Sequence, residues 1–217
     1  MTLQADLFFS FRSPYSYIGA ARYRALGETR DVDIAVRPVY PIAIRDPGFF
    51  KDANPLWVPY LLRDIVRVAQ FHGLPIALPD PDPVVMNMAT REIAAEQPYI
   101  RPITRLGVAA ARRGAGLAFI DEVSRALWGE GVKNWHLPEN LAPIVARAGL
   151  DLAELQADID GREDEFESEI AANHAALEAA GHWGVPTLVF QGEPFFGQDR
   201  IDLAIWRMEQ NGLGPRA

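Results

Sequence analysis

Residues 8–17 are Phe8-Phe9-Ser10-Phe11-Arg12-Ser13-Pro14-Tyr15-Ser16-Tyr17. The apolar and aromatic run that leads into Phe11 favours a buried strand. Ser13 is a typical helix N-cap residue, and Pro14 is of the type best tolerated at the first helical position. We therefore expect a helix to begin directly at a strand end. Such a helix N-terminus presents unpaired backbone N–H groups and a partial positive charge, so it can bind an anion or lower the pKa of a thiol.

The composition is that of a soluble globular protein. The chain has 217 residues, of which 49% are apolar and 23% are charged, enough for one large domain or for a domain with an insertion. The net charge of −8 argues against binding to nucleic acid. No apolar run approaches the ~18 to 20 residues of a membrane span, and no basic segment of a signal peptide precedes Leu7. We expect a cytoplasmic protein that does not bind membranes.

The chain contains no cysteine. This excludes a disulfide framework, a protein thiol nucleophile and disulfide oxidoreductase activity of the protein alone, so any sulfur chemistry must use the thiol of a ligand. The four histidines, His72, His136, His174 and His182, show no metal-ligand spacing. We therefore expect no metal site.

The N-terminal region predicts a βαβ unit. A strand is expected over Ala5–Phe11, a helix over Tyr15–Leu26 that Gly27 ends, and a second strand over Val32–Val39. Two strands joined by a helix at this spacing are normally parallel, with a right-handed crossover.

The middle of the chain predicts helices and no strand, beginning after the turn at residues 46–48. The apolar spacing and the Gly and Pro breaks predict helices over Leu56–Phe71, Asn87–Glu96, Ile100–Arg113, Leu117–Trp128, Pro138–Ala148 and Leu152–Ile159. A proline-rich connector occupies residues 74–84. This region is an all-helical insertion in a sheet-based domain.

The C-terminal region predicts a helix, a hairpin and a last helix. The first helix is expected over Glu163–Ala180, and the hairpin over residues 187–196 with its turn at 191–194. The last helix, Arg200–Asn211, could be capped by Gln198 or Asp199. The whole is an α/β protein in which residues 1–45 and 163–217 form one discontinuous domain and residues 46–162 the helical insertion.

This order of elements resembles the thioredoxin fold in its DsbA-like, insertion-bearing form. More narrowly, residues 9–17 resemble the strand-to-helix motif of 2-hydroxychromene-2-carboxylate isomerases and kappa-class glutathione transferases. Three further segments agree in order and spacing: Trp128-Gly129-Glu130-Gly131, Gly184-Val185-Pro186-Thr187-Leu188-Val189 and Phe196-Gly197-Gln198-Asp199-Arg200-Ile201-Asp202. The resemblance implies glutathione as cofactor and a homodimer.

Ser13 is the catalytic candidate that the resemblance indicates. Its hydroxyl is not appreciably ionised near neutral pH, so it suits a hydrogen-bond donor to the thiolate of bound glutathione better than a nucleophile. The alternative is that Ser13 only caps its helix. The resemblance further implies a cis bond before Pro186 and a main-chain contact between Val185 and the cysteinyl part of glutathione.

Three more residues are candidates for binding glutathione. The resemblance places Gln198 and Asp199 at its γ-glutamyl end, where backbone N–H groups suit a carboxylate and an acidic side chain suits an ammonium. Arg200 ranks below them. The resemblance places Asn54 near the glycyl end. The structural alternatives are an ordinary Asp cap and an ordinary loop asparagine.

The resemblance implies a glutathione-dependent isomerase that acts on an aromatic-derived carboxylate such as 2-hydroxychromene-2-carboxylate. One alternative is a transferase that conjugates glutathione to small electrophiles, and another is a redox-silent, non-catalytic binding protein. Trp128 and Trp135 could line the substrate pocket, but tryptophans at such positions more often belong to the core.

Overall fold

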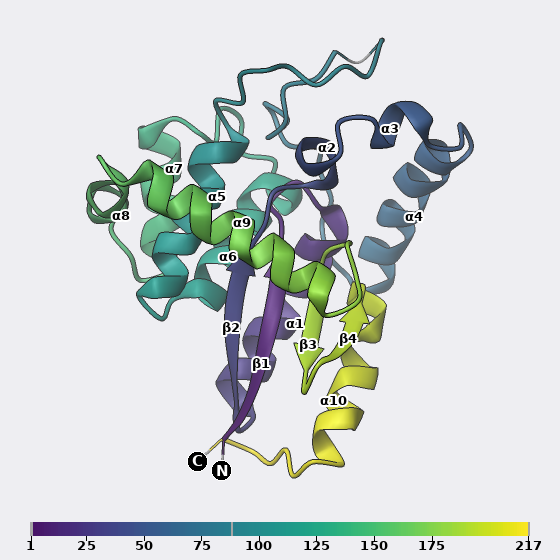
Figure 1. Cartoon of the computed structure of the whole chain (residues 1–217), viewed down its shortest axis with the longest axis vertical. Helices are drawn as coiled ribbons and strands as arrows, with labels where there is room; N and C mark the ends of the chain where they lie inside the picture. Colours follow the sequence, from purple (N-terminus) through teal and green to yellow (C-terminus); the bar gives the residue numbers. More distant parts are fainter. Residues whose placement is uncertain (1, 88, 217) are drawn as a thin grey trace.

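The computed structural model describes residues 2–87 and 89–216, and a four-stranded sheet organises them (Figure 1). The strand order is β2-β1-β3-β4. The bounds are Leu3–Phe9 for β1, Val32–Pro38 for β2, Thr187–Phe190 for β3 and Glu193–Phe196 for β4. β1 pairs parallel with β2, as the βαβ prediction requires, and antiparallel with β3. β3 and β4 pair antiparallel, as the predicted hairpin requires. Helix α9 crosses one face of the sheet and α1 lies behind it.

Helix α1, Pro14–Thr29, connects β1 to β2. The prediction that Gly27 ends this helix is wrong, because the helix continues for two more residues. A methyl group on Gly27 would lie 2.6 Å from the Leu117 Cδ1 atom, so the glycine allows α1 to approach α6, Gly116–Ser124. The role of this glycine is close helix packing rather than termination.

In the view of Figure 1, some of the inserted helices lie beside the β2 edge of the sheet and others lie toward the β4 edge. They are α2 Ile42–Arg45, α3 Phe49–Asp52, α4 Trp57–Phe71, α5 Ile100–Arg112, α6, α7 Pro138–Arg147 and α8 Leu152–Ile159. Helix α6 continues into a π-helical turn over Arg125–Gly129. Buried side chains of the sheet and of α5 to α8 form one hydrophobic core, in which the rings of Phe11 and Phe119 meet edge to face.

The predicted helix over residues 87–96 is wrong. Ile93, within this range, instead forms an isolated antiparallel bridge with Met86, which precedes the range. The Asn87 side-chain oxygen accepts hydrogen bonds from the backbone N–H groups of Ala89 and Thr90, which gives the backbone an alternative to the helix. Arg91 has a positive φ of 61°, which a helix does not allow.

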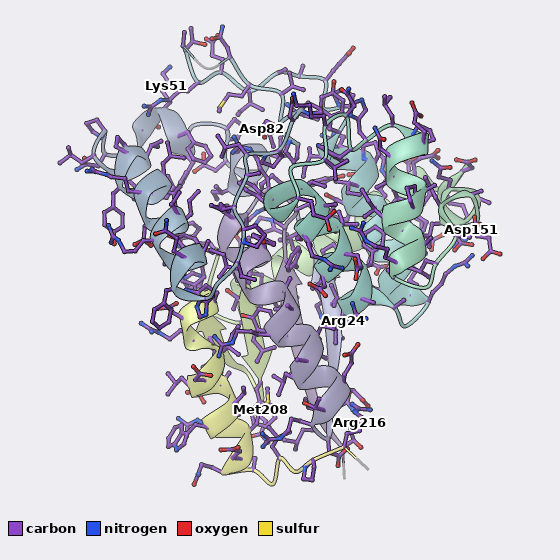
Figure 2. All side chains as sticks on the ribbon, turned by 180° about the vertical axis from the view of Figure 1, so that it is seen from behind. Arg24, Lys51, Asp82, Asp151, Met208 and Arg216 are labelled. Atoms are coloured by element: carbon purple, nitrogen blue, oxygen red, sulfur yellow. The ribbon has the colours of Figure 1, made fainter. Side chains whose placement is uncertain are left out.

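An ion pair joins the connector that follows α4 to the segment between β1 and α1. The Arg12 guanidinium binds the Asp82 carboxylate through two hydrogen bonds of 2.7 and 3.0 Å, and Asp82 is labelled in Figure 2. The Arg12 side chain is only 14% exposed, so this ion pair is better shielded from solvent than an ordinary surface pair.

Helix α9, Glu163–Ala179, returns the chain to the sheet and confirms the predicted helix there. The hairpin turn contains only Gln191 and Gly192, both with positive φ as in a type I′ turn, so β4 begins earlier than expected. A 3₁₀ turn over Gln198–Arg200 precedes the last helix, α10, Ile201–Glu209. Neither Gln198 nor Asp199 caps α10, because the N-cap position is Arg200 and has no side-chain cap.

Among the described residues, no helix is both long enough and apolar enough to cross a membrane.

Candidate functional site

The structure brings Ser13 and Val185 into direct contact. The Ser13 hydroxyl accepts a hydrogen bond of 3.2 Å from the Ser16 backbone N–H and donates one of 3.3 Å to the Val185 carbonyl. Ser13 is therefore the N-cap of α1, as predicted, and it also touches the segment before β3. The Tyr15 backbone N–H, in the first turn of α1, donates to none of the described residues. The helix start keeps an unused donor beside a half-buried hydroxyl.

The loop before β3 is fixed at both ends. The Val185–Pro186 peptide bond is cis. The Pro186 carbonyl accepts a 2.8 Å hydrogen bond from the Gly197 N–H, and the Thr187 hydroxyl donates one of 2.8 Å to the Gly184 carbonyl. These contacts hold Val185 between the first turn of α1 and the segment after β4.

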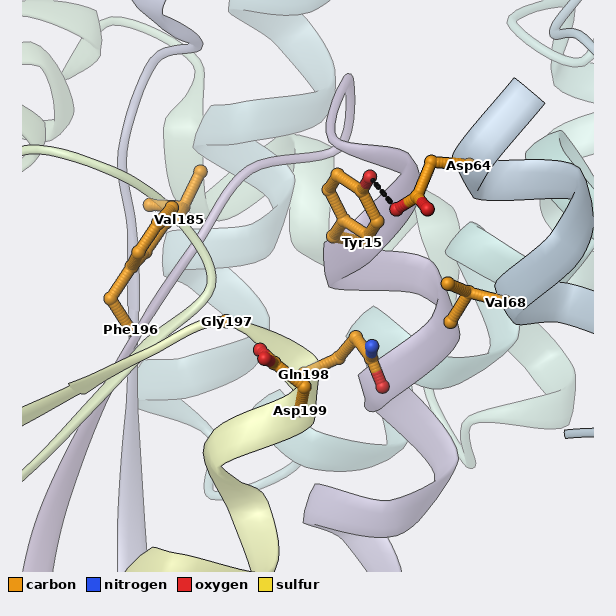
Figure 3. Close-up of a pocket in the computed structure, with 8 residues that line it drawn as sticks. All are labelled: Tyr15, Asp64, Val68, Val185, Phe196, Gly197, Gln198 and Asp199. Carbon is orange, nitrogen blue, oxygen red and sulfur yellow. Dashed lines mark hydrogen bonds between the residues drawn. The ribbon is translucent and has the colours of Figure 1, made fainter. Parts of the chain in front are cut away.

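A pocket of about 290 Å³ opens beside this loop (Figure 3). Its lining comes from α1, α4, the loop before β3 and the segment after β4: Tyr15, Asp64, Val68, Val185, Phe196, Gly197, Gln198 and Asp199. Three of the predicted binding residues, Val185, Gln198 and Asp199, therefore lie together. Ser13 and Pro186 are outside this lining but next to it, through Tyr15 and Val185.

Tyr15 and Asp64 form a pair across the pocket that the sequence did not indicate. The Tyr15 hydroxyl donates a 2.6 Å hydrogen bond to the Asp64 carboxylate (Figure 3). This carboxylate also accepts bonds from Tyr60 and Arg67. Burial and the neighbouring carboxylate raise the pKa of Tyr15 above its usual range, so this phenol resists deprotonation even in alkaline solution. The pair joins α1 to α4 of the insertion, which thus forms one wall of the pocket.

Gln198 and Asp199 differ in how much of each side chain is free. Gln198 is buried, its carboxamide oxygen lies 3.2 Å from His72 Nε2, and its carbonyl accepts a bond of 3.4 Å from Arg22. Asp199 is exposed and pairs only with its neighbour Arg200, at 2.9 Å, among the described residues. Figure 3 shows the two side chains diverging. The exposed Asp199 carboxylate is therefore more accessible to a ligand than the buried Gln198 carboxamide.

Asn54 is not part of this pocket lining. It lies exposed in the loop between α3 and α4, where its side-chain oxygen accepts a 2.9 Å bond from the Leu56 N–H. Its side chain therefore shapes the turn into α4.

Trp128 and Trp135 belong to the core, which confirms the structural interpretation of both. Their side chains are buried, and their indole N–H groups donate to the carbonyls of Phe11 and Pro81. Within residues 2–87 and 89–216, no group of three or more histidine and acidic side chains is placed to hold a metal ion.

Comparisons with known proteins find relatives that cover nearly the whole chain. A 2-hydroxychromene-2-carboxylate isomerase from Pseudomonas putida is 25% identical over 202 residues, which cover 90% of this chain and 89% of that protein. The solved structure of a selenomethionine 2-hydroxychromene-2-carboxylate isomerase is 22% identical, with a TM-score of 0.67 over 96% of this chain and 95% of the other. The cytosolic disulfide reductase DsbM from Pseudomonas aeruginosa, in its structure with GSH, is 17% identical, with a TM-score of 0.60 over 96% of this chain and 100% of that one.

The family model of the DsbA-like thioredoxin domain matches residues 4–205, nearly the whole chain. The expected thioredoxin fold with a helical insertion is confirmed by this match and by the order of the four strands. The protein has the sheet, the helix start and the Pro186 loop of that fold but no thiol of its own. It belongs to the DsbA-like thioredoxin domain family.

Proposed function

We propose that the protein is a glutathione-dependent isomerase that acts on an aromatic-derived carboxylate such as 2-hydroxychromene-2-carboxylate. The observation that carries the proposal is the contact of Ser13, at the start of α1, with the Val185 carbonyl in a chain without cysteine. The relatives named 2-hydroxychromene-2-carboxylate isomerase support the reaction, and the DsbM structure with GSH supports the cofactor.

The backbone of Val185 fits an extended thiol peptide. Its N–H has no hydrogen-bond partner among the described residues, and its carbonyl accepts only the long bond from Ser13. A residue with both backbone groups available can pair with a peptide as an added strand does. The pocket that continues from Val185 ends at Asp199, whose carboxylate suits the ammonium of a γ-glutamyl group. Asn54 lies outside this pocket lining, but the Leu56 N–H occupies only its side-chain oxygen, so its amide N–H groups keep it a candidate for the glycyl carboxylate of glutathione.

Glutathione, when bound, supplies a thiolate that adds reversibly to a conjugated carbon of the substrate. When glutathione is bound, the Ser13 hydroxyl would turn from the Val185 carbonyl and donate a hydrogen bond to the sulfur, and the positive end of α1 and the Tyr15 N–H would favour the negative charge there. Burial and the carboxylate of Asp64 raise the pKa of Tyr15 further above neutrality, so its phenol stays protonated in alkaline solution as well. Pro186 and Val185 hold the peptide in register with Ser13.

Binding and product analysis together test the proposal. We expect calorimetry to show glutathione binding at millimolar or lower concentration. During turnover of 2-hydroxychromene-2-carboxylate, the total glutathione should stay constant over many turnovers. A fall in glutathione that matches product formation would indicate a conjugating transferase. If glutathione does not bind at millimolar concentration, the proposal is wrong, and the alternative of a redox-silent binding protein is favoured. We further propose that the protein is cytoplasmic and forms a homodimer. The sedimentation coefficient tests whether the protein is a dimer.

A further inference from the structure

Six aromatic side chains from three distant segments form one cluster beside the pocket. We call it the aromatic platform, and it consists of Phe49, Phe50, Trp57, His182, Trp183 and Phe196. The ring centroids of Phe49 and Trp183 are 5.6 Å apart, which joins α3 to the loop before β3. The rings of His182 and Phe196 stack at 4.1 Å, which joins that loop to the end of β4. Trp57 completes the cluster at 5.4 Å from Phe49.

The aromatic platform is unusually open for a cluster of large rings. Trp183 is 48% exposed, Phe196 43% and Trp57 36%. A contiguous group of exposed apolar rings marks a binding surface more often than isolated ones do. Aromatic side chains of this size bury ~150 to 250 Å² each, so three half-exposed rings offer roughly 300 Å². A stable protein interface needs about 800 Å² per partner, so the platform matches a small ring better than a protein.

The aromatic platform is continuous with the place proposed for the thiol. Phe196 and Val185 line the same pocket. Trp183 precedes Val185 by two residues, so their Cα atoms lie within roughly 7 Å. The Phe196 ring lies directly on Gly184, where a methyl group would come within 2.5 Å of its Cε2 atom. A group attached to a sulfur at Val185 can therefore reach the platform through Phe196.

The loop that carries Trp183 is held in place without use of its indole. Arg45 donates hydrogen bonds to the carbonyls of Tyr40, at 2.7 Å, and Trp183, at 2.8 Å. The His182 Nδ1 atom accepts a 2.8 Å bond from the Gly184 N–H. Burial lowers the pKa of His182 below its usual value, which leaves this ring neutral at neutral pH. The backbone of this loop is therefore held by hydrogen bonds that do not involve the indole, while the indole itself packs against Phe49 and His182 and leaves about half of its surface exposed.

We propose that the aromatic platform binds the planar aromatic ring of the electrophile that meets the glutathione thiolate, with Trp183 as a residue that determines specificity. This inference rests on the proposed function, since it assigns the substrate side of the same site. The occupant is a small flat apolar ring.

A comparison of two ligands tests the inference. S-Benzylglutathione carries a ring on its sulfur where the electrophile would be, and glutathione does not. We expect calorimetry to show S-benzylglutathione binding to the native protein about tenfold more tightly than glutathione, as expected for one stacked ring. In Trp183→Ala this advantage should disappear while the Kd of glutathione stays the same. The control is Trp206→Ala, which removes an indole of 47% exposure on α10 and should leave both affinities unchanged.

The outcomes separate this inference from the proposed function. If glutathione binds but the benzyl group adds no affinity, or if Trp183→Ala keeps the tenfold advantage, the platform inference is wrong and the glutathione site stands. If neither ligand binds, the proposed function fails and the inference fails with it. If Trp183→Ala keeps the ligand preference but changes the sedimentation coefficient, the platform is a protein interface instead.

Discussion

Replacing Ser13 with alanine separates two roles of one hydroxyl. The hydroxyl caps α1 by accepting the Ser16 N–H at 3.2 Å, and removal of such a cap costs about 1 kcal/mol of stability. Its bond to the Val185 carbonyl is 3.3 Å long, beyond the usual range for a hydroxyl donor, so losing it adds little. We expect Ser13→Ala to lower the free energy of unfolding by about 1 kcal/mol, measured by urea denaturation.

The same substitution should raise the pKa of bound glutathione. A hydrogen bond to a charged group contributes roughly 1.5 to 3 kcal/mol, and one pKa unit corresponds to about 1.4 kcal/mol. Removing the donor that stabilises the thiolate should therefore raise the thiol pKa by about 1 to 2 units. The ultraviolet absorbance of the thiolate, followed against pH in the saturated complex, measures this shift.

Two control variants identify which role is responsible. Ser13→Gly removes the hydroxyl but costs only a few tenths of a kcal/mol as a cap, so it should give the same pKa shift with little loss of stability. Asp151→Ala removes the cap of α8, which accepts two backbone N–H groups on the far side of the molecule from α4 (Figure 2). It should lower stability without changing the thiol pKa. If Ser13→Ala lowers stability but leaves the thiol pKa unchanged, Ser13 is only a cap and the reasoning is refuted.

Three further perturbations follow from the site. Gly184→Ala places a methyl group 2.5 Å from a ring carbon of the aromatic platform and should cost about 1 to 3 kcal/mol in urea denaturation, whereas Gly214→Ala, where nothing lies within 4 Å, should cost almost nothing; equal losses would contradict the close contact. Asp199→Asn should weaken glutathione binding about tenfold in calorimetry, and the control Asp202→Asn should not. If Asp199→Asn binds glutathione as tightly as the native protein, the Asp199 carboxylate does not contact glutathione. The pKa of Tyr15 is higher in the folded than in the unfolded chain, so its contribution to the free energy of unfolding is complete below about pH 10 and is lost as the pH rises beyond that. In urea denaturation at a series of alkaline pH values, Tyr15→Phe should lose stability less steeply than the native protein. An identical dependence of stability on pH in the two proteins would refute the assigned shift.

Local sequence patterns predicted the two ends of the fold. The strand-to-cap transition at Ser13, the parallel βαβ unit and the hairpin each depend on neighbouring residues, and the structure contains all three. The errors occurred where distant or side-chain contacts decide the backbone. Gly27 stays helical because it packs against Leu117, and Asn87 turns the chain through its own side chain.

The candidate site could be predicted only in part for the same reason. The sequence motifs pointed to Ser13, Val185 and Asp199, because each lies in a short segment with a recognisable pattern. The hydrogen bond between Tyr15 and Asp64 joins residues that are 49 positions apart, and no local sequence pattern predicts it. The aromatic platform joins three such segments, and single aromatic residues in a sequence are equally compatible with a buried core.

The position of β1 in the middle of the sheet has a consequence for how the chain folds. β1 and the start of α1 are made long before β3, and Ser13 meets Val185 only after 172 further residues have been added. Contacts between segments so distant in sequence form slowly, because the entropy of closing the loop must be overcome first. The nascent chain therefore carries an uncovered edge of β1 until β3 arrives, and the helical insertion is complete before the pocket exists. The site at Ser13 can therefore form only after β3 has been translated, although Ser13 itself is made 172 residues earlier.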